Sequence, residues 1–379
     1  MAQKEYVRPQ GSLISFMSNK VKQYGGINFA QGIPGYEPPQ ALLQALTDTS
    51  TKSVHQYAPG TGNMQLRELL LKKYSSYGFT HEQLLVTQGA TEAVSLIVTY
   101  LKNIINGSFS AMAFDPVYES YRHVPRIMQI PFIACKSTNF DINAIEKCIV
   151  DNNVRILFLN SPGNPLGKVY TKEQMEALRR LCEWHKVYLI IDAVYKELYF
   201  DEPAFYPIEN LSEFIFYVNS FSKSLSITGW RIGYFFAHES HATGLRDIHD
   251  YIGLCVNSPL QEALATYLAQ ENFGHDYIAA LRNQLRSAYY KMSESLVRNH
   301  LSVSNANGGY YVWAQLPGGG DGFQFAMELY EKSGVAVIPG EHFSDDSVDF
   351  IRLNIARPQA EVDKGIQGIE TFFGTSERE

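Results

Sequence analysis

The amino-acid sequence predicts an α/β protein. Its core would have three α/β/α layers around a mostly parallel seven-stranded sheet, with a smaller α+β domain beside it. Two observations predict this fold class. Between about residues 60 and 280, seven short apolar runs alternate with helical patterns, which is typical of a parallel sheet with helices on both faces. The chain also has 379 residues, and since a single hydrophobic core stops growing near ~250–300 residues, we expect two lobes.

The first fifty residues do not follow this alternation. A Gly/Pro-rich segment at residues 32–35 is followed by a helix whose apolar positions are Ala41, Leu42, Ala45 and Leu46.

The alternating region supplies the sheet and its covering helices. A helix is predicted from Met64 to Tyr74. A second helix, which begins at Gly89, repeats its apolar residues with the 3.6-residue period of an amphipathic helix. The predicted strands lie at residues 84–87, 110–114, 130–135, 156–159, 187–191, 215–218 and 232–237.

The C-terminal part is organised differently again. It contains a long helix after residue 280, an aromatic strand from Tyr310 to Trp313, a glycine turn at 318–320, a strand at 350–355 and a terminal helix that includes residues 362–372. No flexible linker interrupts the chain, so we expect the two lobes to share a long interface.

Composition and charge exclude several classes of function. The formal net charge is −7, which argues against a general nucleic-acid or anionic-membrane binder, because such proteins present a basic face. No apolar run approaches the ~18 residues that span a bilayer, and residues 1–11 lack the apolar core of a secretory signal. The four cysteines form no CxxC pair, and the ten histidines form no metal-binding pattern. We therefore expect a cytoplasmic protein without a metal site.

The most informative motif follows a predicted strand that ends at Asn219. Hydroxyl residues come next, with Lys223 and later Arg231, in the segment SFSKSLSITGWRIGY at 220–234. The carboxyl end of a strand in an α/β sheet is the usual place for an anionic ligand, and a lysine can form a Schiff base with an aldehyde. The alternative is a solvated turn with ordinary charges, and the spacing alone leaves both interpretations open.

A second motif places an acid at the end of an apolar strand. Asp192 follows the run at 187–191, and Tyr195 comes shortly after it. A buried aspartate needs a cationic or hydrogen-bonding partner, and a protonated pyridine nitrogen would supply one. Taken alone, Asp192 is better interpreted as a helix N-cap, which is common where a strand leads into a helix.

Two further motifs lie at turns. Prolines and glycines at residues 160–167 predict a rigid turn that presents the Asn164 side chain in one orientation, although a plain tight turn is the alternative. Small residues at 89–93 begin a helix, so backbone N–H groups there can approach a phosphate. Such junctions also serve packing alone.

The last motif is an arginine inside an apolar strand. Strand alternation puts Ile351, Leu353 and Ile355 on one face, and Arg352 and Asn354 on the other. A buried arginine requires a partner, and its guanidinium fork suits a carboxylate. That partner is either an internal acidic residue or the carboxylate of a substrate.

Together, and in this order, these motifs resemble the fold-type I pyridoxal-phosphate aminotransferases of class I/II, whose fold is the aspartate aminotransferase-like one. The resemblance runs from residue 32 to Arg352, and the segment at 220–234 is its most specific part. Within the family, QYAPGTG at 56–62, with IHDY and VNSP within 248–259, resembles the branch of methionine aminotransferases and kynurenine/glutamine aminotransferases. Leu166 departs from the family's turn, which usually carries threonine there.

The resemblance implies that pyridoxal 5′-phosphate is the cofactor and that Lys223 holds it as a Schiff base and later moves a proton of the substrate. Asp192 would pair with the pyridinium nitrogen. Tyr195 and Asn164 would contact the ring oxygen, and Tyr118 would stack on the ring. The residues implied for the phosphate are Ala90, Thr91, Ser220, Ser222 and Arg231.

The resemblance also implies a homodimer with shared active sites, in which Tyr57 of one subunit reaches the phosphate of the other. The substrate carboxylate would bind to Arg352, Asn164 and the Gly32 backbone. The residues implied for the side-chain pocket are Ile14, Phe16 and Tyr36. Residues 48–280 would form the large cofactor-binding domain, and residues 1–47 and 281–379 would form the discontinuous small domain.

The implied activity is a ping-pong transfer of an amino group between an L-amino acid and a 2-oxo acid. Residues 253–259 offer no arginine for a side-chain carboxylate, and the chain has 24 tyrosines and 22 phenylalanines. Methionine, aromatic amino acids or glutamine are therefore the favoured donors. A C–S β-lyase acting on cystathionine or cysteine conjugates is the alternative, because the same lysine and cofactor serve β-elimination. A non-enzymatic regulator is disfavoured, since residues 1–27 are too short for a DNA-binding domain.

Overall fold

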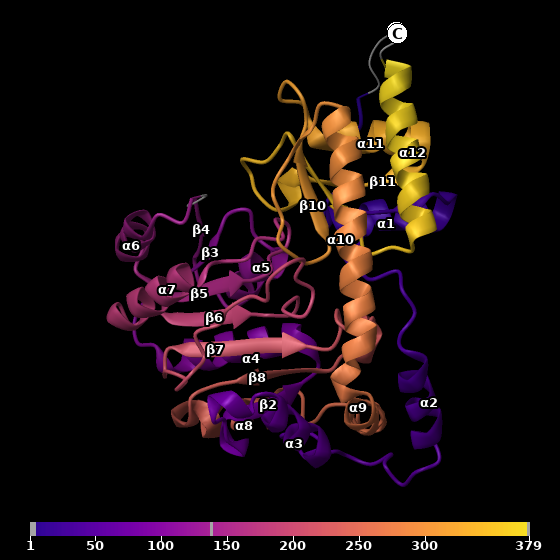
Figure 1. The fold of residues 1–379 in the computed structure, drawn as a ribbon. Coiled ribbons are helices and arrows are strands. Elements are labelled where there is room, and N and C mark those ends of the chain that lie inside the picture. The colour runs from indigo at the N-terminus through magenta and orange to yellow at the C-terminus, as the bar shows by residue number, and fades with distance from the viewer. Residues whose placement is uncertain (1–4, 137–138, 377–379) are drawn as a thin grey trace.

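The computed structural model describes residues 5–136 and 139–376, and a seven-stranded sheet forms the middle layer of its larger lobe (Figure 1). In spatial order the strands are β2 (Leu84–Thr87), β8 (Gly233–Phe236), β7 (Ile215–Ser220), β6 (Tyr188–Asp192), β5 (Val154–Asn160), β3 (Ser110–Phe114) and β4 (Phe132–Cys135). Neighbouring strands of this sheet are parallel, except that β8 is antiparallel to β2 and β7. The prediction of a mostly parallel seven-stranded sheet is therefore confirmed.

Helices cover both faces of this sheet. Successive side chains of a strand point to opposite faces, and in β7 Phe216 and Val218 enter one hydrophobic cluster whereas Ile215 and Tyr217 enter another. The first cluster includes residues of α4 (Gly89–Ile104), α5 (Glu119–Ile127) and α8 (Ala242–Ile252). The second includes residues of α2 (Gln40–Thr49), α3 (Met64–Lys73), α6 (Ile142–Asp151), α7 (Lys172–Trp184) and α9 (Ser258–Gln270). These two clusters make the predicted three-layer arrangement.

The smaller lobe is built from both ends of the chain. Its antiparallel sheet has the order β12 (Ile338–Pro339), β13 (Phe350–Asn354), β10 (Tyr311–Gln315) and β9 (Ser302–Val303). A separate parallel pair, β1 (Ile27–Asn28) with β11 (Val335–Ala336), joins the two ends of the chain. A third hydrophobic cluster packs this lobe together, with residues from α1 (Leu13–Tyr24), α10 (His275–Arg298), α11 (Gly322–Ser333) and α12 (Gln359–Ser376).

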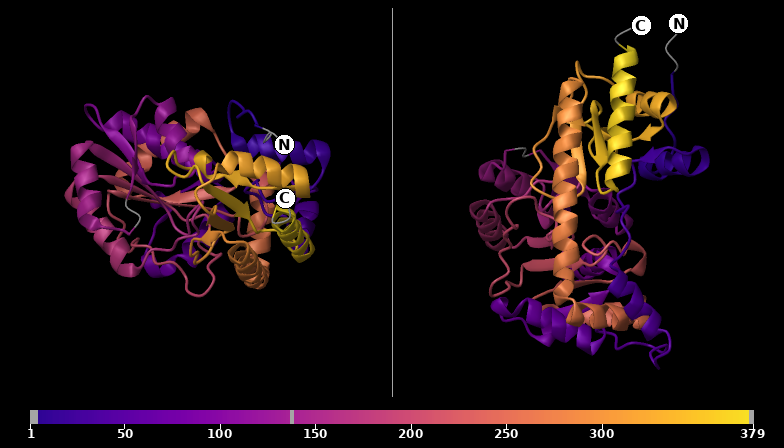
Figure 2. Two further views of the ribbon diagram at one scale, coloured as in Figure 1. Left: turned by 90° about the horizontal axis from the view of Figure 1, so that it is seen from above. Right: turned by 45° about the vertical axis from the view of Figure 1, so that its right-hand side comes forward.

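Helix α10 connects the two lobes. Ile278, near its start, belongs to a core cluster of the larger lobe, whereas Leu281 and Leu285 belong to the cluster of the smaller one. Figure 2 shows this helix extending along both lobes. The expected domain boundary at residue 280 falls inside this helix, and the division into 48–280, 1–47 and 281–379 stays a prediction.

Some element ends differ from those that the sequence predicts. The aromatic strand expected from Tyr310 to Trp313 spans Tyr311–Gln315, because its pairing with β13 and β9 decides where it begins and ends. Within residues 5–136 and 139–376, no helix is long and apolar enough to cross a membrane. The same residues contain no cluster of three or more His, Cys, Asp and Glu side chains that could hold a metal ion.

Candidate active site

A cavity of about 270 Å³, here called the central cavity, lies where three central strands end. Asn160, Asp192 and Ser220 are the last residues of β5, β6 and β7, and all three line it. The carboxyl ends of neighbouring parallel strands meet at one edge of the sheet, which is where α/β proteins bind ligands. The smaller lobe contributes Tyr311 and Arg352 to the wall, so the cavity lies between the two lobes.

Most residues singled out in the sequence line the central cavity. They are Ile14, Gly32, Ala90, Thr91, Tyr118, Asn164, Asp192, Tyr195, Ser220, Ser222, Lys223, Arg231 and Arg352. They come from strand ends, loops and a helix N-terminus that are far apart in the chain. Tertiary folding therefore brings them together.

Three of the residues singled out lie elsewhere. The ring of Phe16 packs against Phe323 in the smaller lobe, with 6.3 Å between ring centroids. The Tyr36 hydroxyl donates a hydrogen bond of 2.8 Å to the backbone oxygen of Arg357. Tyr57 is 83% exposed and lines a surface hollow with residues 255–259. None of these three side chains belongs to the described wall of the central cavity.

Lys223 is held between the two lobes. Its Nζ donates a hydrogen bond of 2.6 Å to the backbone oxygen of Gly32, and the Tyr310 hydroxyl donates one to the Lys223 backbone oxygen. Burial, followed by the positive charges of Arg352 and Arg231, lowers the pKa of the Lys223 amine to about 8. Near neutral pH, the neutral fraction of this amine is therefore far larger than that of an exposed lysine. A nucleophilic or proton-accepting lysine needs this property.

Asp192 is a buried carboxyl group with few partners. It is 6% exposed and accepts hydrogen bonds from the Tyr121 hydroxyl, at 2.6 Å, and the Val194 backbone N–H, at 3.1 Å. Burial raises the pKa of this carboxyl, and the two hydrogen bonds and the charge of Lys223 offset that effect only in part. A cation that also donates a hydrogen bond, such as a protonated ring nitrogen, would stabilise the carboxylate.

A helix N-terminus and an arginine form a cradle for an anion. Helix α4 begins at Gly89, and the Arg231 guanidinium lies so close that a Cβ on Gly89 would collide with it. The N-terminus of a helix carries a partial positive charge and free N–H groups, which favour a phosphate or another anion. The other cavity residues that could contact such an anion are Ala90, Thr91, Ser220 and Ser222.

Arg352 is fully buried and has neutral partners. Its Nη1 donates to Asn164 Oδ1 at 3.0 Å, and its Nη2 donates to the Ala30 backbone oxygen at 2.6 Å. The ring centroids of Tyr311 and Phe343 lie 4.3 and 4.8 Å from the guanidinium carbon. Within the described part of the chain, its Nε has no hydrogen-bond partner and no acidic side chain hydrogen-bonds to its guanidinium. Of the two partners that the sequence leaves open, the carboxylate of a bound molecule fits this arrangement better.

Some cavity residues carry little signal in the sequence. Tyr121 lies three residues beyond Tyr118, so the helical period of α5 could have pointed to it. Glu119 lines the cavity and pairs with His342 of the smaller lobe, with 3.0 Å between Oε2 and Nε2. Tyr311 is visible in the sequence only as part of an aromatic strand, and its place at the cavity follows from the pairing of β10 with β13.

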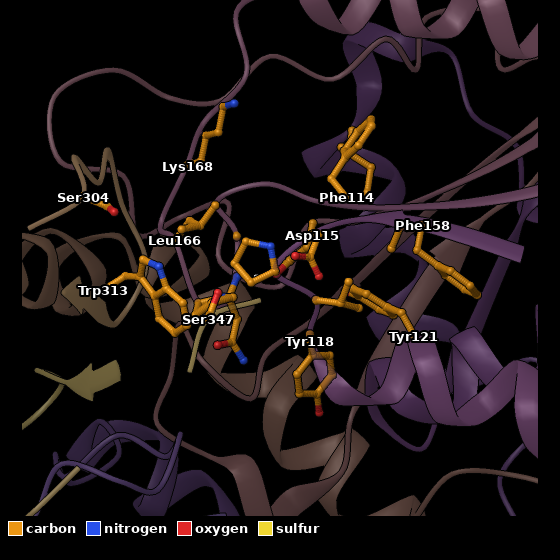
Figure 3. A pocket seen from close by; sticks show the side chains of 18 of the residues that line it. Phe114, Asp115, Tyr118, Tyr121, Phe158, Leu166, Lys168, Ser304, Trp313 and Ser347 are labelled. Carbon is orange, nitrogen blue, oxygen red and sulfur yellow. Dashed lines mark hydrogen bonds between the residues drawn. The ribbon is translucent and has the colours of Figure 1, made fainter. Parts of the chain in front are cut away.

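A second, larger cavity of about 460 Å³, here called the adjoining cavity, lies next to the first (Figure 3). Tyr118, Tyr121, Asn160 and Asn164 line both cavities. Large apolar and aromatic side chains form much of the remaining wall: Phe114, Phe158, Leu166, Tyr170, Trp313 and Phe350. Figure 3 shows side chains from both lobes around this space, with Trp313 and Phe158 on opposite sides.

Comparisons with known proteins agree with this geometry. The family described as aminotransferase class I and II matches residues 24–369. Methionine aminotransferase of Escherichia coli is 28% identical over 363 residues, which cover 92% of each chain. A probable N-acetyl-LL-diaminopimelate aminotransferase of Bacillus subtilis is 26% identical over 364 residues, which cover 94% of this chain and 91% of that relative.

A solved structure shows the same fold. Aspartate aminotransferase from Thermus thermophilus superimposes with a TM-score of 0.87 at 23% identity, covering 97% of this chain and all of that one. Members of the family use pyridoxal phosphate. The central cavity fits that cofactor, since it offers an amine whose pKa is lowered to about 8, a carboxyl group that needs a cation and a cradle for phosphate. The chain therefore belongs to the class I and II aminotransferases and is a fold-type I, pyridoxal-phosphate-dependent aminotransferase.

Proposed function

We propose that this enzyme moves an amino group between an L-amino acid and a 2-oxo acid in two half-reactions, with methionine, an aromatic amino acid or glutamine as the donor. The observation that carries the proposal is the convergence of Lys223, Asp192 and Arg352 on the central cavity, beside a cradle for phosphate. The three side chains offer a reactive amine, an acidic partner for a cationic ring and a cationic partner for the substrate carboxylate.

The cofactor would be held by groups that already converge. When bound, pyridoxal phosphate supplies an aldehyde that links to an amine and a protonated ring that accepts electrons as the substrate's Cα–H bond breaks. Asp192 would hold the ring nitrogen, and Arg231 with the N-terminus of α4 would hold the phosphate. Tyr118 would lie against the ring, while Tyr195 and Asn164 would hydrogen-bond to its oxygen.

Lys223 would carry the proton. Its Nζ would take the proton from the substrate's Cα and later return one, because an amine with a pKa of about 8 can accept and donate near neutral pH. The hydrogen bond from Nζ to the Gly32 oxygen would orient the amine until a ligand replaces that contact.

Arg352 would bind and orient the substrate. In the described structure its guanidinium hydrogen-bonds to neutral acceptors, Asn164 Oδ1 and the Ala30 oxygen, so a carboxylate entering the cavity gains a strong ionic hydrogen bond. The two rings against the guanidinium hold it in place and exclude water. A fixed carboxylate then orients the Cα–H bond towards Lys223.

The proposed donor class rests on the lining of the central cavity. In the described structure, Arg231 and Arg352 are the arginines that line it, and the proposal uses both. Ile14 and Ile33 add apolar surface. A second carboxylate on the substrate would therefore find no further arginine in the described wall of the central cavity. The Escherichia coli relative is named for methionine and the Bacillus subtilis relative for an acetylated diaminopimelate. The acetylated diaminopimelate is therefore the alternative donor that should be compared with methionine.

We also propose a cytoplasmic homodimer with shared active sites. Tyr57 is 83% exposed, and the nearby segment at 251–254 exposes Tyr251, Ile252 and Leu254. A second subunit packed on this surface would cover these apolar groups. Tyr57 of the partner subunit would then reach the phosphate cradle.

A half-reaction screen tests the proposed donor class. The cofactor-loaded enzyme is mixed with each of the twenty amino acids and with N-acetyl-LL-diaminopimelate, without a 2-oxo acid, and the loss of the cofactor's visible absorption is followed. We expect the fastest loss with methionine, aromatic amino acids or glutamine, and no loss in Lys223→Ala.

Other outcomes would change the proposal in defined ways. Fastest loss with aspartate, or with the acetylated diaminopimelate, would overturn the donor class and leave the transfer reaction in place. Release of pyruvate from cystathionine without any 2-oxo acid would show a C–S β-lyase instead.

A further inference from the structure

We propose that Tyr311 is a positioning residue, which holds Arg352 in place through its ring and orients the hydroxyl of Tyr195 through its own hydroxyl. In this arrangement the Tyr195 hydroxyl is free to donate its hydrogen bond to the cofactor's ring oxygen. The inference rests on the proposed function, in which Tyr195 contacts that oxygen.

The strand pairing places Tyr311 beside Arg352. Tyr311 begins β10 and lies opposite Asn354 of β13, while Arg352 lies opposite Trp313. Tyr311 and Arg352 are therefore diagonal neighbours on one face of the sheet, where long and aromatic side chains touch. The distance of 4.3 Å from the guanidinium carbon to the ring centroid is that of a cation–π contact.

The hydroxyl of Tyr311 reaches a second functional group. It lies 2.9 Å from the Tyr195 hydroxyl, and both side chains are buried, with 1% and 4% exposure. The Tyr195 ring is fixed by contacts with Tyr310 and Tyr311, whose centroids lie 5.4 and 5.9 Å away. A Cβ on Gly32 would lie 2.6 Å from the Tyr311 oxygen, so only glycine there leaves room for this hydroxyl.

The hydrogen-bonding capacity of the two hydroxyls allows two arrangements, and the proposal is the one in which Tyr311 donates to Tyr195. Each hydroxyl has one proton to donate and can accept from other donors, so only one of them can donate within the pair. If Tyr311 donates, the proton of Tyr195 is free for a third group, and Tyr195 becomes a better donor because it also accepts. The cavity is where that third group would lie, since both Tyr195 and Tyr311 line it.

Tyr195 acts in this arrangement as a permanent donor rather than a titrating acid. Burial, followed by the neighbouring Tyr311, raises the pKa of Tyr195 well above its ordinary value. The other titratable and charged groups that face this part of the cavity are Tyr118, Glu119, Tyr121, Asp192, Lys223, Arg231, Tyr310 and Arg352. Replacing Tyr311 changes the hydrogen bond to Tyr195 and removes none of these charges. A change in the cofactor's protonation would therefore come from that hydrogen bond.

The test is a spectroscopic pH titration of the cofactor-loaded enzyme without substrate. A hydrogen bond donated to the ring oxygen makes that oxygen a weaker acceptor for the nearby proton of the lysine–cofactor linkage, so the linkage loses its proton more easily. Loss of the hydrogen bond should therefore raise the pH midpoint of the change in visible absorption. We expect Tyr311→Phe to raise the midpoint by about half a unit to one unit, the range of one neutral hydrogen bond. Tyr195→Phe should raise it further, and the double variant should match Tyr195→Phe, because Tyr311 acts through Tyr195.

Two further variants separate this role from simple packing. Tyr289 is a buried tyrosine of the smaller lobe whose hydroxyl donates to the Ser304 backbone oxygen at 3.1 Å, away from the cavity. Tyr289→Phe should lower the unfolding temperature without moving the midpoint. Tyr311→Leu, which removes the ring from Arg352, should raise the amino-acid KM about fivefold, whereas Tyr311→Phe should keep it within about twofold.

Each outcome has a defined meaning. An unchanged midpoint in Tyr311→Phe, or shifts that add in the double variant, would overturn the role of Tyr311. An unchanged midpoint in Tyr195→Phe would overturn the inference at Tyr195 itself. Failure of the proposed function would show differently, as a wild-type enzyme whose visible absorption no amino acid removes.

Discussion

The central cavity and the adjoining cavity share the walls made by Tyr118 and Asn164 but differ in their chemistry. The central cavity is the smaller, at about 270 Å³, and charged groups of both signs converge on it. The adjoining cavity is larger, at about 460 Å³, and is walled by aromatic rings, while Lys136 and Asp346 at its edge pair with each other. Size therefore does not identify the site. The convergence of Lys223, Asp192 and Arg352 beside an anion cradle does.

The position of each cavity on the sheet explains this difference. The central cavity lies at the ends of β5, β6 and β7, where strand ends and a helix N-terminus deliver polar side chains to one place. The adjoining cavity lies against β3 and β5, and Trp313 and Phe350 of the smaller lobe form part of its wall. Four experiments test whether the two cavities differ in function.

The largest effect on activity should come from replacing Lys223, and Lys168 provides the matched control. Lys223 lines the central cavity and Lys168 the adjoining one, and burial lowers the pKa of both amines. We expect Lys223→Ala to lower kcat by roughly 10³-fold or more, because it loses both the covalent anchor and the proton carrier. Lys168→Ala should keep kcat within about twofold. A similar loss in both variants would contradict the functional difference between the cavities.

The next effect concerns the substrate carboxylate. Arg352→Ala removes a hydrogen-bonded cation, and such bonds contribute about 1.5–3 kcal/mol, which is roughly 10- to 100-fold in amino-acid KM. Arg352→Lys keeps the charge but loses the fork, so its KM should lie in between. Steady-state kinetics with the best donor give these values, and circular dichroism checks that each variant is folded. An amino-acid KM that stays at the wild-type value would remove Arg352 from the carboxylate site.

The pH dependence of cofactor loading should follow the pKa of Lys223. Only the neutral amine attacks the aldehyde, and with a pKa of about 8 roughly a tenth of it is neutral at pH 7, several-hundredfold more than for an ordinary lysine. The rate at which the cofactor-free protein takes up pyridoxal phosphate should therefore rise about tenfold per pH unit below pH 7 and level off above about pH 8. A rate that keeps rising through pH 10 would mean that the pKa of Lys223 is not lowered.

The smallest effect on activity should come from the adjoining cavity. Phe350 stacks on Trp313, with ring centroids 5.2 Å apart, and is partly buried. Phe350→Ala should reduce the free energy of unfolding by about 1–3 kcal/mol, less than for a fully buried phenylalanine. The value of kcat/KM should stay within about threefold. Urea unfolding and steady-state kinetics measure both, and a tenfold fall in kcat/KM would give this cavity a part in the reaction.

Much of the larger lobe could be predicted from the sequence. Strands β2 and β3 begin and end where the apolar runs do, because strands buried on both faces consist of continuous apolar residues. Asp192 and Ser220, at the ends of β6 and β7, could also be recognised, because they are polar residues that follow apolar runs. Local patterns therefore pointed to many of the larger lobe's residues in the central cavity, but not to Glu119 and Tyr121.

The rest depends on contacts that no local pattern encodes. Phe16 and Tyr36 were expected in the side-chain pocket, yet Phe16 packs on Phe323 and the Tyr36 hydroxyl bonds to the backbone of Arg357. Their positions depend on how the first forty residues cross the smaller lobe. The sequence gives no local signal for Tyr311, because its position at the cavity depends on the register between β10 and β13. The adjoining cavity is formed by side chains from both lobes, so neither lobe's sequence could reveal it.

The parallel pairing of β1 with β11 has a consequence for synthesis on the ribosome. Residues 27–28 have no strand partner until residues 335–336 have been made, and Arg352 comes later still. The core clusters of the larger lobe need only residues between 42 and 278, so that lobe can fold first. A nascent chain arrested before residue 335 would have a folded larger lobe but no partner for its N-terminal strand and no Arg352. Completing the active site is therefore one of the last events in making this protein.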